Sequence, residues 1–142
     1  MKIAIGSDHA GYAYKEKLVK YLTDKSFEIE DFGTFSTDSV DFPDFAHPTA
    51  EAVETGKAEF GILLCGSGQG VNITANKHQG VRSALCWNTD IARLSRQHNN
   101  ANIIALPARF VSYEYAVEMI NVFLETKFEG GRHENRVGKI PC

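Results

Sequence analysis

Residues 60–66, "FGILLCG", decide the fold, because this run is apolar from end to end. A strand without a polar face is typical of a parallel sheet that helices cover on both sides. Three similar runs lie elsewhere, "KIAIGSD" (2–8), "RSALCW" (82–87) and "NIIALPA" (102–108), and "FEIEDFG" (27–33) alternates like a further strand. The sequence therefore predicts five parallel strands, with Cys86 and Trp87 of the 82–87 run in the core.

Helical segments separate these strands. They are expected at about 11–25, from Pro43 onward, in a short stretch after Gly70, at about 88–97 and at about 112–126. Strand and helix thus alternate five times, and right-handed crossovers give a Rossmann-like three-layer α/β sandwich. The 142 residues suffice for one domain with its own core, so we predict a single domain spanning 1–142.

Composition excludes several classes of function. A net charge of −3 argues against non-specific binding of nucleic acid, and no apolar run has the ~20 residues that cross a bilayer. The first residues turn polar too soon for a secretory signal. The three cysteines are too widely spaced for a disulfide framework or a zinc site, which suits a reducing compartment. We therefore expect a cytoplasmic protein without membrane or nucleic-acid partners, and no histidine and carboxylate spacing that would hold a metal.

In a sheet of this kind, ligands bind beyond the carboxyl ends of the strands. The segments expected there are "SDHAG" (7–11), "CGSGQG" (65–70) and "PARF" (107–110). In the second of them, the glycines at alternate positions, Gly66, Gly68 and Gly70, let the backbone turn sharply and present its N–H groups to an oxyanion. Cys65 beside such donors would be a base or nucleophile, unless it is an inert cysteine at the end of a buried strand.

Spacing excludes two familiar phosphate loops at this cysteine. A tyrosine-phosphatase loop needs arginine six residues after the cysteine, where Val71 stands. A Walker A loop needs lysine and then serine or threonine after its last glycine, and Val71 and Asn72 follow Gly70 here.

Histidines accompany polar residues at two places. Asp8 and His9 could bind sugar hydroxyls or shuttle protons, or Asp8 could simply cap the following helix. His98 and Asn99 suit the end of a helix, and they precede a strand. Within one subunit they therefore lie at the opposite edge of the sheet from Cys65. A catalytic His98 would act most simply in the site of a neighbouring subunit.

The C-terminal tail is basic. Arg132 and Arg136 are four residues apart, on one face if the tail is helical, and His133 lies beside them. Such a pair can clamp a phosphate, and Arg109 after the last strand could add a third donor. The alternative is an ordinary solvated tail, which is common at chain ends.

Six segments together resemble the type B ribose-5-phosphate isomerases, a family that includes the subunits of galactose-6-phosphate isomerase. In chain order they are "GSDHAG", "DFPDFA", "CGSGQG", "ANKHQGVRSAL", "ARLSRQHNNAN" and "GGRHENRV". The resemblance covers nearly the whole chain. It implies a Rossmann-like fold, no metal or other cofactor, and a homodimer or dimer of dimers whose active sites are shared between subunits.

The chemistry implied by this resemblance is the interconversion of D-ribose 5-phosphate and D-ribulose 5-phosphate through a cis-enediolate. Cys65 would be the base, since Val71 stands where members that carry serine at the cysteine position have a glutamate. The loop glycines would leave backbone N–H groups free for the enediolate oxygens, and Ser67 would orient the ring oxygen or a nearby hydroxyl.

The resemblance also implies the remaining roles. His98 would help to open the furanose ring, Asp8 and Asn99 would bind hydroxyls, and His9 would lie near the ring or phosphate. The phosphate would be held by Arg109 and, from the tail (about 127–142), by Arg132, His133 and Arg136.

Because of departures from the family pattern, the sequence does not decide which sugar phosphate is the substrate. Phe42 stands where tyrosine is common, so a hydroxyl contact is absent. The alternatives are a six-carbon substrate such as allose 6-phosphate or galactose 6-phosphate, a non-catalytic sugar-phosphate-binding subunit, or a nucleotide-binding regulatory domain on the same fold.

Overall fold

The computed structural model describes all residues, 1–142, and its sheet has five strands that are all parallel. The strands lie in the spatial order β2-β1-β3-β5-β4. Their bounds are β1 (Lys2–Ser7), β2 (Glu28–Asp31), β3 (Phe60–Cys65), β4 (Ser83–Leu85) and β5 (Ile103–Pro107). The predicted parallel sheet is thereby confirmed, and β3, the apolar run, lies at its centre with every residue buried.

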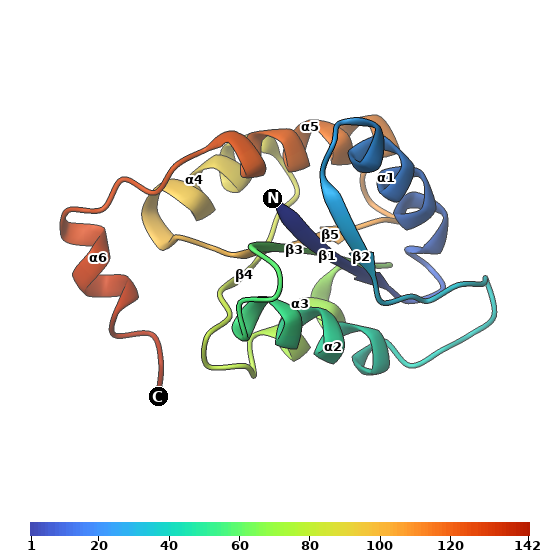
Figure 1. The fold of residues 1–142 in the computed structure, drawn as a ribbon, viewed down its shortest axis with the longest axis horizontal. Helices are drawn as coiled ribbons and strands as arrows, with labels where there is room; N and C mark the ends of the chain where they lie inside the picture. The colour runs from blue at the N-terminus through green and yellow to red at the C-terminus, as the bar shows by residue number, and fades with distance from the viewer.

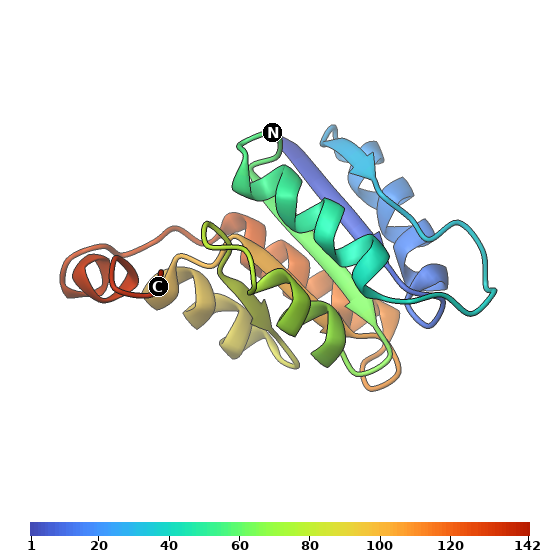
Figure 2. The same ribbon diagram turned by 90° about the horizontal axis from the view of Figure 1, so that it is seen from below.

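Helices cover both faces of the sheet, as Figure 1 shows. One face carries α1 (Tyr12–Asp24), α4 (Thr89–Asn99) and α5 (Tyr113–Glu125), and the other carries α2 (Pro43–Glu54) and α3 (Gln69–Ala75). Each face has its own buried apolar cluster against the sheet. The three-layer sandwich is therefore confirmed. A sixth helix, α6 (Arg132–Val137), lies beyond α4 and outside the layers in both views (Figure 2).

Local sequence signals fix where the helices begin and end. The side chain of Asn88 accepts a hydrogen bond from Ile91 N at the start of α4, and Ser112 does the same for Tyr115 N at the start of α5. Pro43 occupies the first turn of α2, where no backbone N–H is needed. After α4 the chain reverses through Asn100, which adopts the left-handed conformation that asparagine tolerates.

The edge strands are shorter than the sequence predicts. β2 covers only Glu28–Asp31, and β4 ends at Leu85. Trp87 therefore lies beyond the end of β4 and is 55% exposed, so its predicted place in the core is wrong, whereas Cys86 is fully buried. The cause is position in the sheet, because β4 is an outermost strand with no neighbour beyond it.

The two ends of the sheet are therefore distinct places. Cys65 pairs with Pro107 at the carboxyl ends of β3 and β5, and Gly61 pairs with Ile103 where β5 begins. The end of α4 comes just before β5, at the opposite end from Cys65. The pairing spans four residue steps, or roughly 13 Å of strand. No helix has the length and hydrophobicity of a membrane span.

Candidate functional site

A cleft of about 350 Å³ opens at the carboxyl ends of the central strands. It is lined by Asp8 after β1, by Cys65, Gly66, Ser67 and Gly70 from β3 and its loop, by Arg109 and Phe110 after β5, and by Phe42 before α2. All three segments expected at this end of the sheet thus contribute to one cleft.

Cys65 is the last residue of β3, is 5% exposed and carries a free thiol. Beyond it, the chain stays bound to the segment after β5, because Cys65 O accepts from Ala108 N at 2.9 Å and Gly66 O accepts from Arg109 N at 3.0 Å. The thiol therefore lies at the end of β3, where the chain is hydrogen-bonded to the segment after β5, and it lines the cleft.

The loop after Cys65 leaves its amides unpaired. The N–H groups of Gly66, Ser67, Gly68 and Gly70 donate to no backbone or side-chain acceptor in the protein. Gly68 must be glycine, since its φ is 75° and a Cβ there would lie 2.5 Å from Leu85 Cδ1. These free donors are what an oxyanion in the cleft would need.

Asp8 serves two purposes at once. Its Oδ1 accepts from Ala10 N at 2.9 Å and from Gly11 N at 3.2 Å, so it caps the turn before α1. Its Oδ2 makes no hydrogen bond, and the residue lines the cleft. The capping role and the ligand-binding role are therefore compatible.

His9 is held by a backbone contact. Its Nδ1 accepts a hydrogen bond from Val40 N at 3.2 Å, in the loop that leads to α2. A neutral imidazole that accepts at Nδ1 carries its proton on Nε2. His9 therefore offers an N–H donor at Nε2.

Arg109 and two phenylalanines shape the rim of the cleft. The Arg109 side chain runs over Gly66, where a Cβ would lie 3.2 Å from its Nη1. The ring of Phe42 covers Gly70 in the same way, at 2.7 Å from a built Cβ, and Phe110 is 77% exposed. The cleft thus has one cation beside the loop and apolar walls.

A second cluster of predicted residues lies at the other end of the sheet. The rings of His98 and His133 stack with centroids 4.3 Å apart. The Nε2 atoms of these two histidines lie 3.7 Å and 3.5 Å from Oε1 of Glu129. Burial lowers the pKa of His133, and the charges of His98, Arg132 and Arg136 lower it further. This imidazole is consequently held in its neutral form to lower pH than usual.

Arg96 fixes the end of α4 that bears His98. Its guanidinium is buried and donates to Ala101 O at 2.6 Å, to Asn100 Oδ1 at 2.8 Å and to Thr126 O at 3.2 Å. The C-terminal tail is tied here as well, because Glu129 N donates to Gln97 O at 3.1 Å. Sequence reasoning missed both Arg96 and Glu129. The signal for Arg96 was its spacing of four residues from the buried Ala92 on one face of α4.

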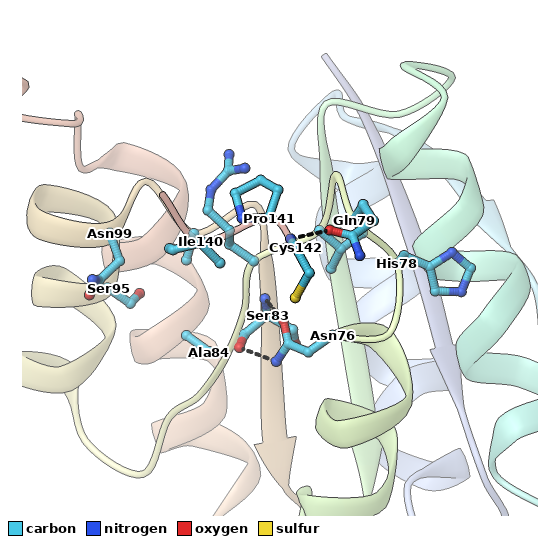
Figure 3. Close-up of a pocket in the computed structure, with 13 residues that line it drawn as sticks. Asn76, His78, Gln79, Ser83, Ala84, Ser95, Asn99, Ile140, Pro141 and Cys142 are labelled. Carbon is cyan, nitrogen blue, oxygen red and sulfur yellow. Dashed lines mark hydrogen bonds between the residues drawn. The ribbon is translucent and has the colours of Figure 1, made fainter. Parts of the chain in front are cut away.

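Asn99 lines neither the cleft at Cys65 nor the cluster of His98, Glu129 and His133. It borders a different cavity of about 350 Å³, between the end of α4 and the loop after α3, which is covered by Ile140, Pro141 and Cys142 (Figure 3). The last of these donates its N–H to Gln79 Oε1 at 2.9 Å. Ser83 and Ala84 of β4 form its floor.

The predicted site residues therefore fall into two groups. The structure brings together Asp8, Cys65, Gly66, Ser67, Gly70 and Arg109 in the cleft, with Gly68 in the same loop and His9 next to Asp8. It places His98, Asn99, Arg132, His133 and Arg136 at and beyond the end of α4. The expectation that no histidine and carboxylate spacing suits a metal overlooked Glu129 and His133, which are four residues apart and lie beside His98.

Comparison with known proteins identifies the family. The model of the ribose/galactose isomerase family matches residues 3–140. The chain belongs to the ribose/galactose isomerase family. The predicted resemblance is thereby confirmed over nearly the whole chain. The prediction that the protein is an isomerase is confirmed as well.

Curated and solved members of the ribose/galactose isomerase family are similar over their full length. The chain is 42% identical to ribose-5-phosphate isomerase B of Escherichia coli, over 98% of this chain and 93% of the relative. A crystal structure of a ribose 5-phosphate isomerase from Thermotoga maritima superposes with a TM-score of 0.96 at 51% identity, covering 99% and 97% of the two chains.

A third member was solved with a sugar phosphate. The structure of ribose-5-phosphate isomerase B from Mycoplasma genitalium contains bound ribulose-5-phosphate. It superposes with a TM-score of 0.95 at 41% identity and covers 98% of this chain and 93% of its own. The Rossmann-like fold is therefore that of solved members of the family.

Proposed function

We propose that the protein interconverts D-ribose 5-phosphate and D-ribulose 5-phosphate as a metal-independent aldose–ketose isomerase. The observation that carries this proposal is the free thiol of Cys65 below a loop with unpaired amides. The names of the relatives and the ribulose-5-phosphate complex of the Mycoplasma genitalium enzyme support the choice of a five-carbon sugar.

Cys65 is the base in the proposed mechanism. Once the ring is open, its thiolate removes the proton from C2 of the aldose and returns it to C1 of the cis-enediolate. The proton of the C2 hydroxyl moves to the C1 oxygen, so that C1 becomes an alcohol and C2 becomes the ketone carbonyl. The negative charge of the enediolate between these steps falls on the sugar oxygens. The unpaired amides of Gly66, Ser67, Gly68 and Gly70 would receive it, and one such preorganised donor is worth about 3–4 kcal/mol.

The other cleft residues orient the sugar. Asp8 accepts hydrogen bonds from sugar hydroxyls through its free Oδ2. Ser67 has its hydroxyl hydrogen available, since its Oγ already accepts from Gln69 N, and it holds the ring oxygen or a hydroxyl. His9 does not line the cleft itself, but it follows Asp8 directly and would donate through Nε2 to the ring or the phosphate.

The phosphate and ring-opening groups come from a second subunit in this proposal. The cleft itself contains one arginine, Arg109, and no imidazole that lines it. His98 would open the furanose ring by proton transfer at the ring oxygen, beside Asn99, which would hold a hydroxyl. Arg132, His133 and Arg136 would join Arg109 on the phosphate. All five of these residues lie at the far end of their own sheet.

A two-fold axis at the edge of β4 would bring the two halves together. β4 is an edge strand, with α3, which starts at the cleft, on one side and α4, whose last turn carries His98, on the other. Antiparallel approach of two such edges sets the cleft of one subunit against the His98 end of the other. Ile73, Trp87 and Leu94 are large apolar residues exposed by 58%, 55% and 40% around this edge. A second copy would bury them, in a homodimer or in a dimer of dimers.

The test is turnover of ribose 5-phosphate by the purified protein in EDTA, beside allose 6-phosphate and galactose 6-phosphate. Rapid conversion of the pentose alone is the expected result. Turnover of only a hexose phosphate would mean that the substrate is a six-carbon sugar phosphate. No turnover of any of the three would favour a non-catalytic sugar-phosphate-binding subunit. The cytoplasm stays our prediction for its location.

A further inference from the structure

Two imidazoles and one carboxylate converge at the end of α4. His98 comes from α4, Glu129 from the segment after α5, and His133 from α6. One possible ligand atom of each residue lies within 4.8 Å of the other two, and no other three such residues of the chain converge in this way.

The distances to the carboxylate are close to those of a metal site. Zn²⁺ binds nitrogen and oxygen ligands at about 2.0–2.1 Å, so two ligand atoms of a tetrahedral site are about 3.4 Å apart. Glu129 Oε1 lies 3.7 Å from His98 Nε2 and 3.5 Å from His133 Nε2. Each imidazole nitrogen therefore needs to move by only a few tenths of an ångström relative to Glu129, whereas the two imidazoles, whose ligand atoms lie within 4.8 Å of each other, must approach by up to about 1.4 Å. The stacked rings must also tilt toward the carboxylate, and His98 is free to do so because its side chain is 41% exposed.

Hydrogen bonding leaves the ligand atoms available. The Nε2 atoms of His98 and His133 form no hydrogen bond with Glu129, because both distances are longer than the usual donor–acceptor distance. Arg132 and Arg136 lie near His133, and their charge opposes a cation. The affinity should therefore be that of a reversible ligand and not of a structural metal.

We propose that His98, Glu129 and His133 form a binding site for a divalent transition metal such as Zn²⁺, and that an occupied site inhibits the enzyme. Imidazole and carboxylate ligands suit Zn²⁺, and the three residues leave its fourth position open. Inhibition rests on the proposed function, because His98 cannot transfer a proton to the sugar through an Nε2 that is bound to the metal. The binding itself does not depend on that function.

Isothermal titration of the full chain with Zn²⁺ tests the site. We expect one Zn²⁺ per chain, and at least a tenfold weaker affinity, roughly, in each of Glu129→Gln and His133→Ala. His47→Ala is the matched control. In that other histidine pair, His47 Nδ1 lies 2.8 Å from His78 Nε2, and Glu54 approaches the opposite nitrogen of His78, so the ligand atoms diverge.

A second control separates this site from the thiol. Cys65→Ser should keep the affinity for Zn²⁺, and Co²⁺ should give a spectrum without a thiolate charge-transfer band. The proposal is overturned if no saturable binding occurs, or if binding is lost in Cys65→Ser or His47→Ala but kept in Glu129→Gln. Turnover should fall as the site fills and recover with EDTA. Binding without inhibition would overturn the inhibitory role alone.

Discussion

The two ends of the sheet hold complementary chemistry. At the carboxyl end, a free thiol lies below four unpaired amides, with one arginine and two phenylalanines at the rim. At the other end, two imidazoles, two arginines and a carboxylate lie around the end of α4. Parallel strands about 13 Å long keep these groups apart. Because these groups lie apart within one subunit, we propose that a complete site needs residues from two subunits.

Removal of the proposed base at the carboxyl end should lower activity the most. Cys65→Ala should lower turnover by about 10²–10⁴-fold with little change in KM, because a general base acts only in the chemical step. The rise of activity with pH that reports thiol ionisation should disappear as well. Steady-state kinetics across pH checks this.

The matched control is the exposed cysteine at the C-terminus. Cys142→Ala should keep the turnover of the parent protein, since this thiol lies outside the cleft. Near-normal turnover of Cys65→Ala would mean that another group is the base.

Dissociation of the proposed dimer, which separates the cleft of one subunit from the His98 end of the other, should lower activity nearly as much. Trp87→Asp places a charge in the proposed interface, where an unpaired buried charge costs about 3–5 kcal/mol. The dissociation constant of the dimer should therefore rise at least about a hundredfold. Activity should then depend on protein concentration. Sedimentation measures both species. Phe35→Asp, the same change at an aromatic residue exposed by 65% in another loop, should leave the dimer intact.

A smaller effect is expected at the one cation of the cleft. Arg109→Gln removes a charged hydrogen bond worth about 1.5–3 kcal/mol, so KM should rise by roughly 10–100-fold while turnover changes less. Arg93→Gln is the control, since Arg93 pairs only with Asp90 on the surface of α4. Equal KM values for both variants would contradict a phosphate role for Arg109.

The smallest expected difference is in the rate at which the two buried thiols, Cys65 and Cys86, are alkylated. Burial raises the pKa of Cys86 to about 12, so this thiol stays protonated and inert at pH 8. Alkylation with iodoacetamide, followed by mass spectrometry, should modify Cys142 first and Cys86 not at all. Loss of activity should follow modification of Cys65, and ribulose 5-phosphate should slow it. Inactivation that follows Cys86 instead would contradict this assignment.

The sequence was sufficient for the sheet and for half of the site. Apolar runs predict buried strands, and parallel strands place Asp8, Cys65 and Arg109 at one end because topology alone decides which ends meet. The position of His98 at the other end followed from the same rule. Trp87 was misplaced because an apolar run does not reveal where an edge strand ends.

Contacts made by side chains could not be predicted in this way. Arg96 binds three oxygens in two segments, and Glu129 meets His98 from 31 residues away. Nothing in local spacing indicates such encounters. They depend on how α4, α5 and the tail pack, which is set by the whole core.

The central claim, that each active site takes residues from two subunits, is tested most directly by mixing two inactive variants. Cys65→Ala and His98→Asn are purified separately, mixed in equal amounts, and exchanged through mild denaturant. Half of the resulting dimers should be mixed, each with one intact site, so about a quarter of the parent activity should return. Recovery near that value is the predicted result. A mixture as inactive as its components, with subunit exchange shown by mass, would contradict shared sites.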